Sequence, residues 1–346
     1  MKVLLLGAAG QLGLCVQDAL HDGAHQLVPL PRHDLDLTDP AELRAAFAQH
    51  RPDVVINAAA YNAVDRAESH AECAYRVNAQ APAQLAELCL NSDSYLIHFS
   101  TDYVFDGQPQ MGQSILNGQP SKILNGQPSN GEPASLPGQQ QVPAPVPGQA
   151  TFPGQTPLTG QTPYTEQALT HPLSVYGASK LAGERAVLAS GCSATLIRTS
   201  WLFSEYGSNF VKTMLRLANQ AEPIRVVTDQ LGCPTYAGDL AQVVRQLLAW
   251  EVLDGRQRPT GLFHYGGDSV LSWYGFAQQI ISRAEALGLL RQSPRLVPIC
   301  ASDFNSPAQR PAFSALDSRL LTEQLGWAAS DWQRALDLVL VRLRHP

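Results

Sequence analysis

A tyrosine and a lysine four residues apart are the first candidates for chemistry in the sequence. Tyr176 and Lys180 occur in the run Tyr-Gly-Ala-Ser-Lys, on a helix predicted over about 174–189. Residues at i and i+4 share one face of a helix, so the two side chains would lie together. A nearby ammonium stabilises a phenolate and lowers the tyrosine's pKa, which makes the tyrosine a usable general acid. An ordinary pair on a helix surface is the alternative interpretation.

A hydroxyl after a predicted strand is the next candidate. The apolar run 95–99 is followed by Ser100-Thr101-Asp102-Tyr103. Ligands bind at the carboxyl ends of strands in doubly wound sheets. Thr101 is therefore predicted to hydrogen-bond a substrate carbonyl beside the tyrosine, with a simple strand-terminal turn as the alternative.

A glycine loop near the N-terminus predicts a dinucleotide site. Gly7, Gly10 and Gly13 form the pattern G-x-x-G-x-x-G between a predicted strand, 3–6, and a predicted helix, 12–20. Glycines let the backbone turn tightly and approach a pyrophosphate, and the helix N-terminus offers it free N–H groups. The position after a strand and before a helix is the context that this motif requires. We expect the loop, including Gln11 and Leu12, to bind the cofactor.

The end of the second predicted strand bears on the choice of cofactor. The sequence there is Leu-Pro-Arg-His, with the arginine at Arg32. An acidic residue at this point favours NAD, whereas an arginine suits the 2′-phosphate of NADP. Arg32 therefore favours NADPH and leaves NADH open, and an exposed loop arginine is the alternative. Asp36 and Leu37 follow, where a backbone turn would line the adenine.

These residues need a scaffold, and the apolar pattern predicts one. Continuous apolar runs indicate strands buried on both faces. The expected strands are 3–6, 26–30, 54–56, 95–99, 194–197 and 224–227, and the expected helices are 12–20, 39–49, 71–90 and 174–189. This alternation predicts an α/β fold built on a Rossmann-type doubly wound parallel sheet. From Trp201 onward the rhythm loosens, and we expect a smaller C-terminal lobe there.

Composition limits the classes of function. The chain has 346 residues, 45% of them apolar and 16% charged, and a net charge of −6. The length favours two domains, and the charge gives no electrostatic footprint for nucleic acid. The sequence contains no apolar run long enough for a membrane span. The apolar start hints at a signal peptide, but its run is too short and glycines follow at once, so a secreted protein is not expected. Six cysteines without a CxxC pair or metal-like spacing favour reduced thiols in a cytoplasmic protein.

A segment of unusual composition interrupts the pattern at 108–161. Counted from 107 to 161, Gly, Pro and Gln make up 30 of 55 residues. The heptapeptide Ile-Leu-Asn-Gly-Gln-Pro-Ser begins at Ile115 and again at Ile123. This composition predicts a disordered or loosely turned insertion, because the apolar content is too low to build a core. A docking site for a partner is the alternative.

Taken together, the motifs resemble those of the extended short-chain dehydrogenase/reductases, especially members that act on nucleotide sugars. The stretches that carry the likeness, besides the glycine loop, are 57–68, 100–107, 175–184, 198–201, 209–218, 229–235 and 310–311. The likeness covers nearly the whole chain outside the insertion. It implies hydride transfer from NADPH to C4 of dTDP-6-deoxy-L-lyxo-4-hexulose, giving dTDP-L-rhamnose.

The resemblance also implies a role for each site residue. Tyr176 would donate the proton, Lys180 would hold the nicotinamide ribose, and Thr101 would complete the catalytic triad. Asp102 would contact the sugar, Trp201 would lie against the substrate, and Ala60, Tyr61 and Asn62 would border the cofactor. Arg310 is expected to face the diphosphate, with a loop arginine as the alternative. The other tryptophans in this part of the chain, Trp250, Trp273, Trp327 and Trp332, are expected to be packing residues.

The implied domains are a dinucleotide-binding domain, 1–107 with 162–200, and a mainly substrate-binding lobe, 201–346. The insertion separates Thr101 from Tyr176 by more residues than in the family, so it leaves and rejoins the chain at the active-site edge. Some family members dimerise around magnesium held by carboxylates, one of them just after the glycine loop. Leu14-Cys15 stands there in this sequence. We therefore expect no metal, and a homodimer stays open.

Two other functions fit the same motifs. One is another nucleotide-sugar reductase or an epimerase of the same fold, and an epimerase would retain its NAD. The other is a catalytically silent, nucleotide-binding regulatory subunit. The intact set of Tyr176, Lys180 and Thr101 argues against that second alternative.

Overall fold

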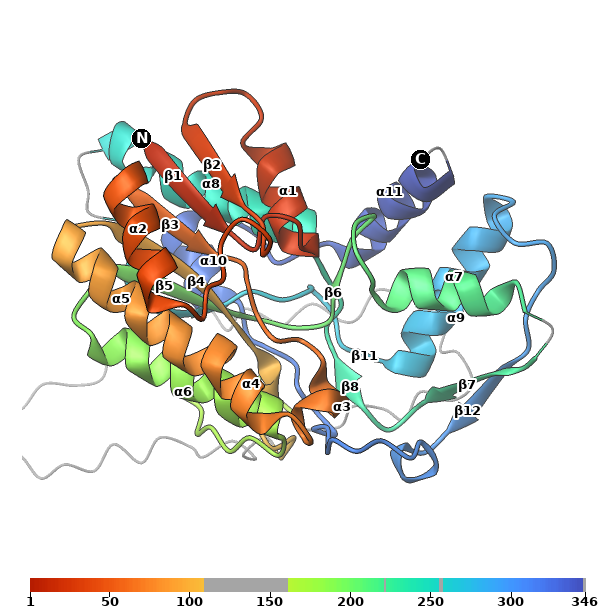
Figure 1. The fold of residues 1–346 in the computed structure, drawn as a ribbon. Helices are drawn as coiled ribbons and strands as arrows, with labels where there is room; N and C mark the ends of the chain where they lie inside the picture. The colour runs from red at the N-terminus through yellow and green to blue at the C-terminus, as the bar shows by residue number, and fades with distance from the viewer. Residues whose placement is uncertain (109–160, 221, 255–257, 345–346) are drawn as a thin grey trace, which may run out of the picture. The chain divides into compact units, whose positions relative to one another are not determined.

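A parallel six-stranded sheet forms the centre of the fold (Figure 1). Its strands are β1 Lys2–Leu6, β2 Gln26–Leu30, β3 Val54–Asn57, β4 Tyr95–Thr101, β5 Ala194–Thr199 and β10 Gly261–His264. Their order is β10-β5-β4-β3-β1-β2. Strand β1 pairs with both β2 and β3, so the direction of winding reverses beside β1, where α/β sheets open a ligand crevice. The sheet confirms the predicted doubly wound α/β fold.

The structure describes residues 1–108, 161–220, 222–254 and 258–344. Apart from residue 161, the described residues belong to one unit of the chain, 1–109 with 162–346. The predicted insertion at 108–161, with its repeat, lies almost entirely outside the described residues.

Alternate side chains of the strands enter two separate cores, one on each face of the sheet. Val3, Leu5 and Ile56 pack with helices α1 Gln11–Ala19 and α8 Ala237–Asp254. On the opposite face, Leu4 and Val55 pack with α2 Pro40–His50, α5 Ala81–Ser92 and α6 Val175–Ala189. Successive residues of a strand point to opposite faces, so a sheet covered on both faces needs continuous apolar strands. Strands β3 and β4 are buried over their whole length.

The helix predicted over 71–90 is three segments in the structure. They are α4 Ala71–Tyr75, the π-helix η1 Arg76–Gln80, and α5. Pro82 has no N–H to donate to the carbonyl four residues earlier, that of Asn78. That carbonyl packs against α6, where a Cβ on Gly183 would come within 2.0 Å of it. The missing bond and this close approach explain why the helix changes its winding here.

A second lobe is built around its own apolar core. Its helices are α7 Phe210–Ala218, α9 Trp273–Ala286 and α11 Trp332–Arg344. Three short strand pairs accompany them: β7 Ile224–Val227 with β12 Leu296–Ile299, β8 Leu231–Gly232 with β11 Leu271–Ser272, and β6 Leu202–Phe203 with β9 Thr235–Tyr236. The predicted strand 224–227 exists, but it pairs with β12 outside the main sheet. Part of the range 201–346 returns to the first lobe, because α8 covers the main sheet and β10 forms its edge.

Three local findings bear on metals, disulfides and membranes. All six cysteines carry free thiols. Across the described ranges, no group of three His, Cys, Asp or Glu side chains is arranged to hold a metal ion. No helix in that part of the chain is long and apolar enough to cross a membrane.

Candidate active site

The glycine loop connects β1 to α1 in a conformation that needs glycine. Gly7 has φ 73°, in the left-handed region, and a Cβ there would lie 2.6 Å from the Ala59 nitrogen. A Cβ on Gly13 would lie 2.4 Å from the Gly7 oxygen, so this glycine lets α1 pack against the loop. Gly10 caps α1 with extended backbone. The loop thus places the helix N-terminus, with its free N–H groups, beside the ends of the central strands.

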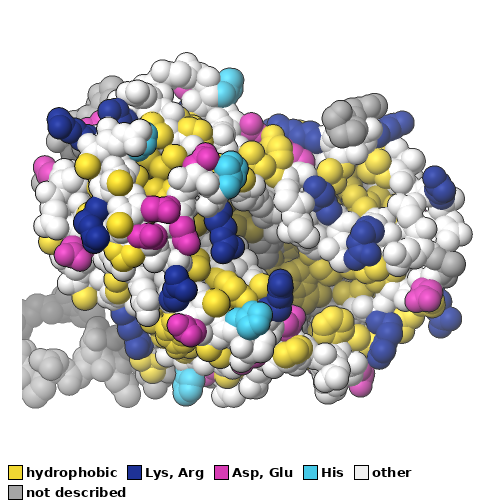
Figure 2. Space-filling model, in the orientation of Figure 1, with side chains coloured by type: hydrophobic (Ala, Val, Ile, Leu, Met, Phe, Trp, Pro, Cys, Tyr) yellow, Lys and Arg dark blue, Asp and Glu magenta, His cyan; other side chains and the backbone are white. Residues whose placement is uncertain are grey.

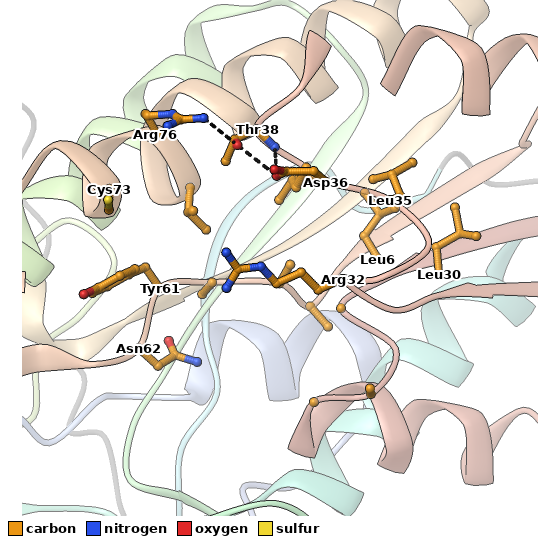
Figure 3. A pocket seen from close by; sticks show the side chains of 18 residues that line it. Leu6, Leu30, Arg32, Leu35, Asp36, Thr38, Tyr61, Asn62, Cys73 and Arg76 are labelled. Carbon is orange, nitrogen blue, oxygen red and sulfur yellow. Dashed lines mark hydrogen bonds between the residues drawn. The ribbon is translucent and has the colours of Figure 1, made fainter. Parts of the chain in front are cut away.

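A pocket of about 420 Å³ opens over this loop (Figure 3). It lies at the carboxyl ends of β1, β2 and β3, at the switch point of the sheet. The predicted cofactor residues that line it are Gly7, Gly10, Arg32, Asp36, Leu37, Ala60, Tyr61 and Asn62. Its size and position fit part of a dinucleotide.

Three predicted cofactor residues in the glycine loop do not line this pocket. Leu12 is buried in the core below α1, and Gly13 packs against the loop backbone. The Gln11 side chain accepts a hydrogen bond from the amide of Asn209, 2.8 Å away, which joins the loop to the start of α7. Leu12 and Gly13 therefore support the loop by packing beneath it, and Gln11 joins it to the start of α7.

The sequence interpretation missed part of the pocket wall. Thr38, Cys73, Arg76 and Val77 also line the pocket, and three of them come from α4 and η1. Asn78 anchors this segment, because its amide oxygen accepts a hydrogen bond from the Tyr61 N–H at 2.8 Å. No local motif marks Cys73, Arg76 and Val77, and only the packing of the helix after β3 brings these three to the cofactor pocket.

The predicted catalytic residues come together where β4 meets α6. The Ser174 hydroxyl caps α6 by accepting a hydrogen bond from the Gly177 N–H, 3.1 Å away. The helix then presents Tyr176 and Lys180 on successive turns, both buried. Thr101 ends β4, and its side chain lies beside Tyr176, where it acts to lower the tyrosine's pKa. The structure thus assembles the three side chains of the predicted triad.

Burial dominates the electrostatics of the two α6 residues. It raises the pKa of Tyr176 above its usual value, against the opposing effect of the neighbouring Thr101 side chain. It lowers the pKa of Lys180 to about 8, against the nearby carboxylate of Glu184. The Lys180 ammonium donates to the carbonyl of Phe99 at 2.7 Å. The prediction that the lysine lowers the tyrosine's pKa is therefore not seen in this structure. Burial of Tyr176 outweighs the other effects on its pKa, and the Lys180 ammonium donates its hydrogen bond to a β4 carbonyl.

Asp102 lies directly behind the catalytic hydroxyls. Its side chain is 2% exposed and accepts a hydrogen bond from the Thr101 hydroxyl at 3.0 Å. Burial raises its pKa to about 6, although the neighbouring side chains of Ser314 and Thr101 favour the ionised form. A carboxylate is therefore held close to the triad with limited access to water.

A second pocket, of about 690 Å³, lies in the C-terminal lobe. Its wall includes Phe210, Arg225, Trp273 and Arg310, from α7, β7, α9 and the segment before residue 311. Figure 2 shows a hollow in this face, with hydrophobic side chains on the wall formed by the C-terminal lobe and Lys and Arg side chains around it. An apolar wall with basic groups suits a nucleotide with its diphosphate.

The two predicted substrate residues of this lobe are both held by neighbours. Trp201 has φ 45° and stacks on Trp273, with ring centroids 3.5 Å apart. Trp273, predicted to be a packing residue, also lines the second pocket, because the stack extends to its wall. Arg310 lines the pocket as well, while its guanidinium pairs with the carboxylate of Asp65 at 2.8 Å.

The remaining predicted packing tryptophans differ in their surroundings. Trp332 is buried in the core of the C-terminal lobe. Trp327 packs against the core of the first lobe but also lines a third pocket, of about 470 Å³. Trp250 is partly buried on α8.

Comparison with known proteins places this geometry in a family. The model of the RmlD substrate binding domain matches residues 1–119 and 148–345. The chain belongs to this family. A dTDP-4-dehydrorhamnose reductase of Aggregatibacter actinomycetemcomitans is 36% identical, over 97% of each chain. One of Burkholderia thailandensis is 35% identical, over 98% of this chain and 97% of that one.

A solved structure in the same family agrees over the whole chain. The dTDP-4-dehydrorhamnose reductase of Bacillus anthracis, in complex with NADP, superposes with a TM-score of 0.77 at 28% identity, covering 99% of both chains. The unmatched gap in the family model, 120–147, falls inside the predicted insertion. The resemblance inferred from the motifs is thereby confirmed at the level of the family.

Proposed function

We propose that the protein is an NAD(P)H-dependent oxidoreductase that reduces the C4 keto group of dTDP-6-deoxy-L-lyxo-4-hexulose, also called dTDP-4-dehydrorhamnose, to dTDP-L-rhamnose. NADPH is the proposed hydride donor. The observation that carries the proposal is the assembly of Thr101, Tyr176 and Lys180 beside the glycine-loop pocket, since Tyr176 packs in the same cluster as Tyr61 of the pocket wall. The relatives' shared activity and the NADP bound to the solved relative support the substrate and the cofactor.

In the proposed reaction, the chain's residues handle the proton and the orientation. A bound nicotinamide supplies the hydride, which forms the new C–H bond at C4 of the sugar. Tyr176 gives its hydroxyl proton to the keto oxygen as the C=O double bond becomes a C–O single bond. Lys180, one turn along the helix, holds the nicotinamide ribose and stabilises the phenolate that is left. Thr101 fixes the keto oxygen beside the tyrosine.

The proposed substrate site runs from the triad into the second pocket. Asp102, the neighbour of Thr101 in the chain, contacts the sugar. Trp201 lies along the substrate, with Trp273 stacked against it. Arg310 binds the diphosphate, for which it exchanges its contact with Asp65, and Arg225 adds a further guanidinium to the same pocket. Guanidinium groups bind phosphate bidentately, which suits this assignment.

We also propose a domain organisation, a partner and a location for the chain. Residues 1–107 with 162–200 are the dinucleotide-binding domain, and most of 201–346 forms the substrate lobe. The nucleotide sugar is the partner, a homodimer is the candidate assembly, and the cytoplasm is the proposed location. Gel filtration with light scattering tests the assembly directly.

Stoichiometry distinguishes the proposed reaction from its alternatives. The purified protein is incubated with the 4-keto sugar nucleotide and NADPH, and both the oxidised cofactor and the sugar product are measured. One NADP⁺ formed for each dTDP-L-rhamnose supports the reductase. Conversion of the sugar without consumption of NADPH would indicate an epimerase, and no conversion together with cofactor binding would indicate a regulatory subunit.

A further inference from the structure

Arg76 projects toward the cofactor pocket from a segment that the glycine-loop motif does not include. It is the first residue of η1, and it lines the pocket together with Arg32. Figure 3 shows the Arg76 guanidinium beside the turn that contains Asp36 and Thr38, and the Arg32 guanidinium in the middle of the pocket, between that turn and Asn62. The Arg76 Nη2 donates a hydrogen bond to the Thr38 hydroxyl at 2.9 Å. One edge of the guanidinium is thus fixed, and the group keeps further donors for a ligand.

The sheet topology indicates which part of a dinucleotide lies there. The pyrophosphate is expected at the N-terminus of α1, next to Gly10. Tyr176 and Thr101 mark the nicotinamide end, beside β4. Strand β2 lies at the opposite edge of the sheet, beyond β1. The adenosine half therefore extends over the end of β2, where Arg32 and Arg76 stand.

The acidic side chains of this turn are already engaged by its backbone. Asp36 Oδ1 accepts hydrogen bonds from the Thr38 N–H at 2.9 Å and the Thr38 hydroxyl at 2.8 Å, and these bonds lower the pKa of Asp36. Glu42 accepts a bond from the Asp36 N–H at 2.7 Å. A free carboxylate on the ribose 2′-hydroxyl is typical of NAD sites. Here the carboxylates stabilise the turn. The charges of Arg32 and Arg76 also help to lower the pKa of Asp36, but within the described residues neither arginine forms an ion pair.

We propose that Arg76 and Arg32 together bind the 2′-phosphate of NADPH, with Thr38 holding Arg76 in position. This inference rests on the proposed dinucleotide binding and adds a residue that determines the choice between NADPH and NADH. The 2′-phosphate is the group by which the two cofactors differ, and a phosphate dianion is bound strongly by charged donors. The anchoring of η1 to the pocket wall through Asn78 keeps Arg76 at a fixed place relative to the turn.

Binding of two small nucleotides tests this inference without the sugar substrate. Calorimetry compares 2′,5′-ADP with 5′-ADP, which lacks the 2′-phosphate, on the full chain, on Arg76→Ala, on Arg32→Ala and on the control Arg44→Ala. Arg44 is an exposed arginine on α2 outside the pocket. We expect Arg76→Ala to weaken 2′,5′-ADP binding about ten- to a hundredfold, from the loss of charged hydrogen bonds, and to change 5′-ADP binding less than about twofold. The control should bind both nucleotides like the unmodified chain.

Two results would overturn the inference. One is an equal loss of both nucleotides in Arg76→Ala, which would place the arginine on the adenine or in the fold. The other is unchanged 2′,5′-ADP binding. Thermal unfolding of each variant checks that the fold is retained, and Arg76→Lys, which keeps the charge, should recover part of the lost affinity.

The calorimetry together with the reduction assay separates this inference from the proposed activity. Selective 2′,5′-ADP binding without any reduction of the 4-keto sugar would contradict the reductase and support the arginine pair. Sugar reduction with equal use of NADPH and NADH by the unmodified chain and by Arg76→Ala would support the reductase and contradict the arginine pair.

Discussion

The Thr101 hydroxyl donates its hydrogen bond to the buried carboxylate of Asp102, with 3.0 Å between the two oxygens. The hydroxyl also accepts a bond from the Tyr103 N–H at 3.2 Å. A threonine hydroxyl has one proton, so an ionised Asp102 holds the proton that Thr101 would otherwise offer to a substrate. The charge on Asp102 therefore affects both the stability of the fold and the orientation of a catalytic group.

Asp102→Asn is expected to stabilise the protein at neutral pH. Burial raises the pKa of this carboxyl from an ordinary value of 3.8 to about 6, so the folded chain binds the proton more tightly than the unfolded chain. The contribution of Asp102 to stability should therefore fall as pH rises from about 4 to about 6, by about 3 kcal/mol in total. The gain from asparagine should be small near pH 4 and reach its full size above pH 6. Urea unfolding of Asp102→Asn and of the unmodified chain at pH 4 and pH 7.5 measures this gain. A lower stability of Asp102→Asn at pH 7.5 would contradict the prediction.

Tyr176→Phe is expected to remove turnover and keep cofactor binding. Loss of general acid catalysis typically costs about 10² to 10⁴ in rate. Phenylalanine keeps the ring that packs edge-on against Tyr103, with centroids 5.6 Å apart, so the fold should persist. Stopped-flow rates and NADPH titration measure the two effects. Tyr75→Phe, which changes an exposed tyrosine on α4, is the matched control and should keep its activity. Unreduced turnover in Tyr176→Phe would rule out the tyrosine as the proton donor.

The reduction rate is expected to fall as pH rises through about 8. Burial lowers the pKa of Lys180 to about 8, so the ammonium loses its proton in this range. The protonated lysine is the form that stabilises a phenolate, so the rate should decrease as the lysine loses its proton. A pH profile of kcat measures this fall, and Lys180→Met should lower the rate and remove that limb of the profile. A rate that increases through pH 8 would contradict the role of the ammonium.

Glu184→Gln is expected to destabilise the fold strongly. The guanidinium of Arg198 meets the Glu184 carboxylate through two hydrogen bonds, 2.9 and 2.7 Å long, and both side chains are buried. Removing one partner leaves a buried charge uncompensated, which typically costs about 3–5 kcal/mol. Asp22→Asn, which breaks an exposed pair with Arg245, is the control and should change stability little. Chemical unfolding measures both variants; equal, small effects would show that the buried pair contributes nothing.

The sequence was sufficient for the scaffold and the centre of the site because their signals are local. Buried parallel strands require continuous apolar runs, and the turn at Gly7 requires glycine at a left-handed φ. The helical spacing of Tyr176 and Lys180 directly placed both on α6. Thr101 could be located because strand ends meet at one edge of the sheet.

The missed features depend on contacts between distant segments. Arg76 reaches the cofactor pocket only because η1 packs beside the end of β3. The break in the helix before Pro82 comes from a carbonyl that packs on Gly183 of another helix. The raised pKa of Tyr176 follows from burial, which the spacing of two side chains does not reveal. Pairings of this kind have no signature in a single sequence.

Transfer of deuterium tests the central claim most directly. NADPH deuterated at both C4 positions of the nicotinamide is incubated with the protein and dTDP-6-deoxy-L-lyxo-4-hexulose, and the sugar product is examined by mass spectrometry and NMR. The proposed reaction predicts one deuterium at C4 of dTDP-L-rhamnose for each NADP⁺ formed, and almost no product with Tyr176→Phe. A sugar product without deuterium, or label that stays entirely in the cofactor, would contradict hydride transfer from NADPH to this sugar.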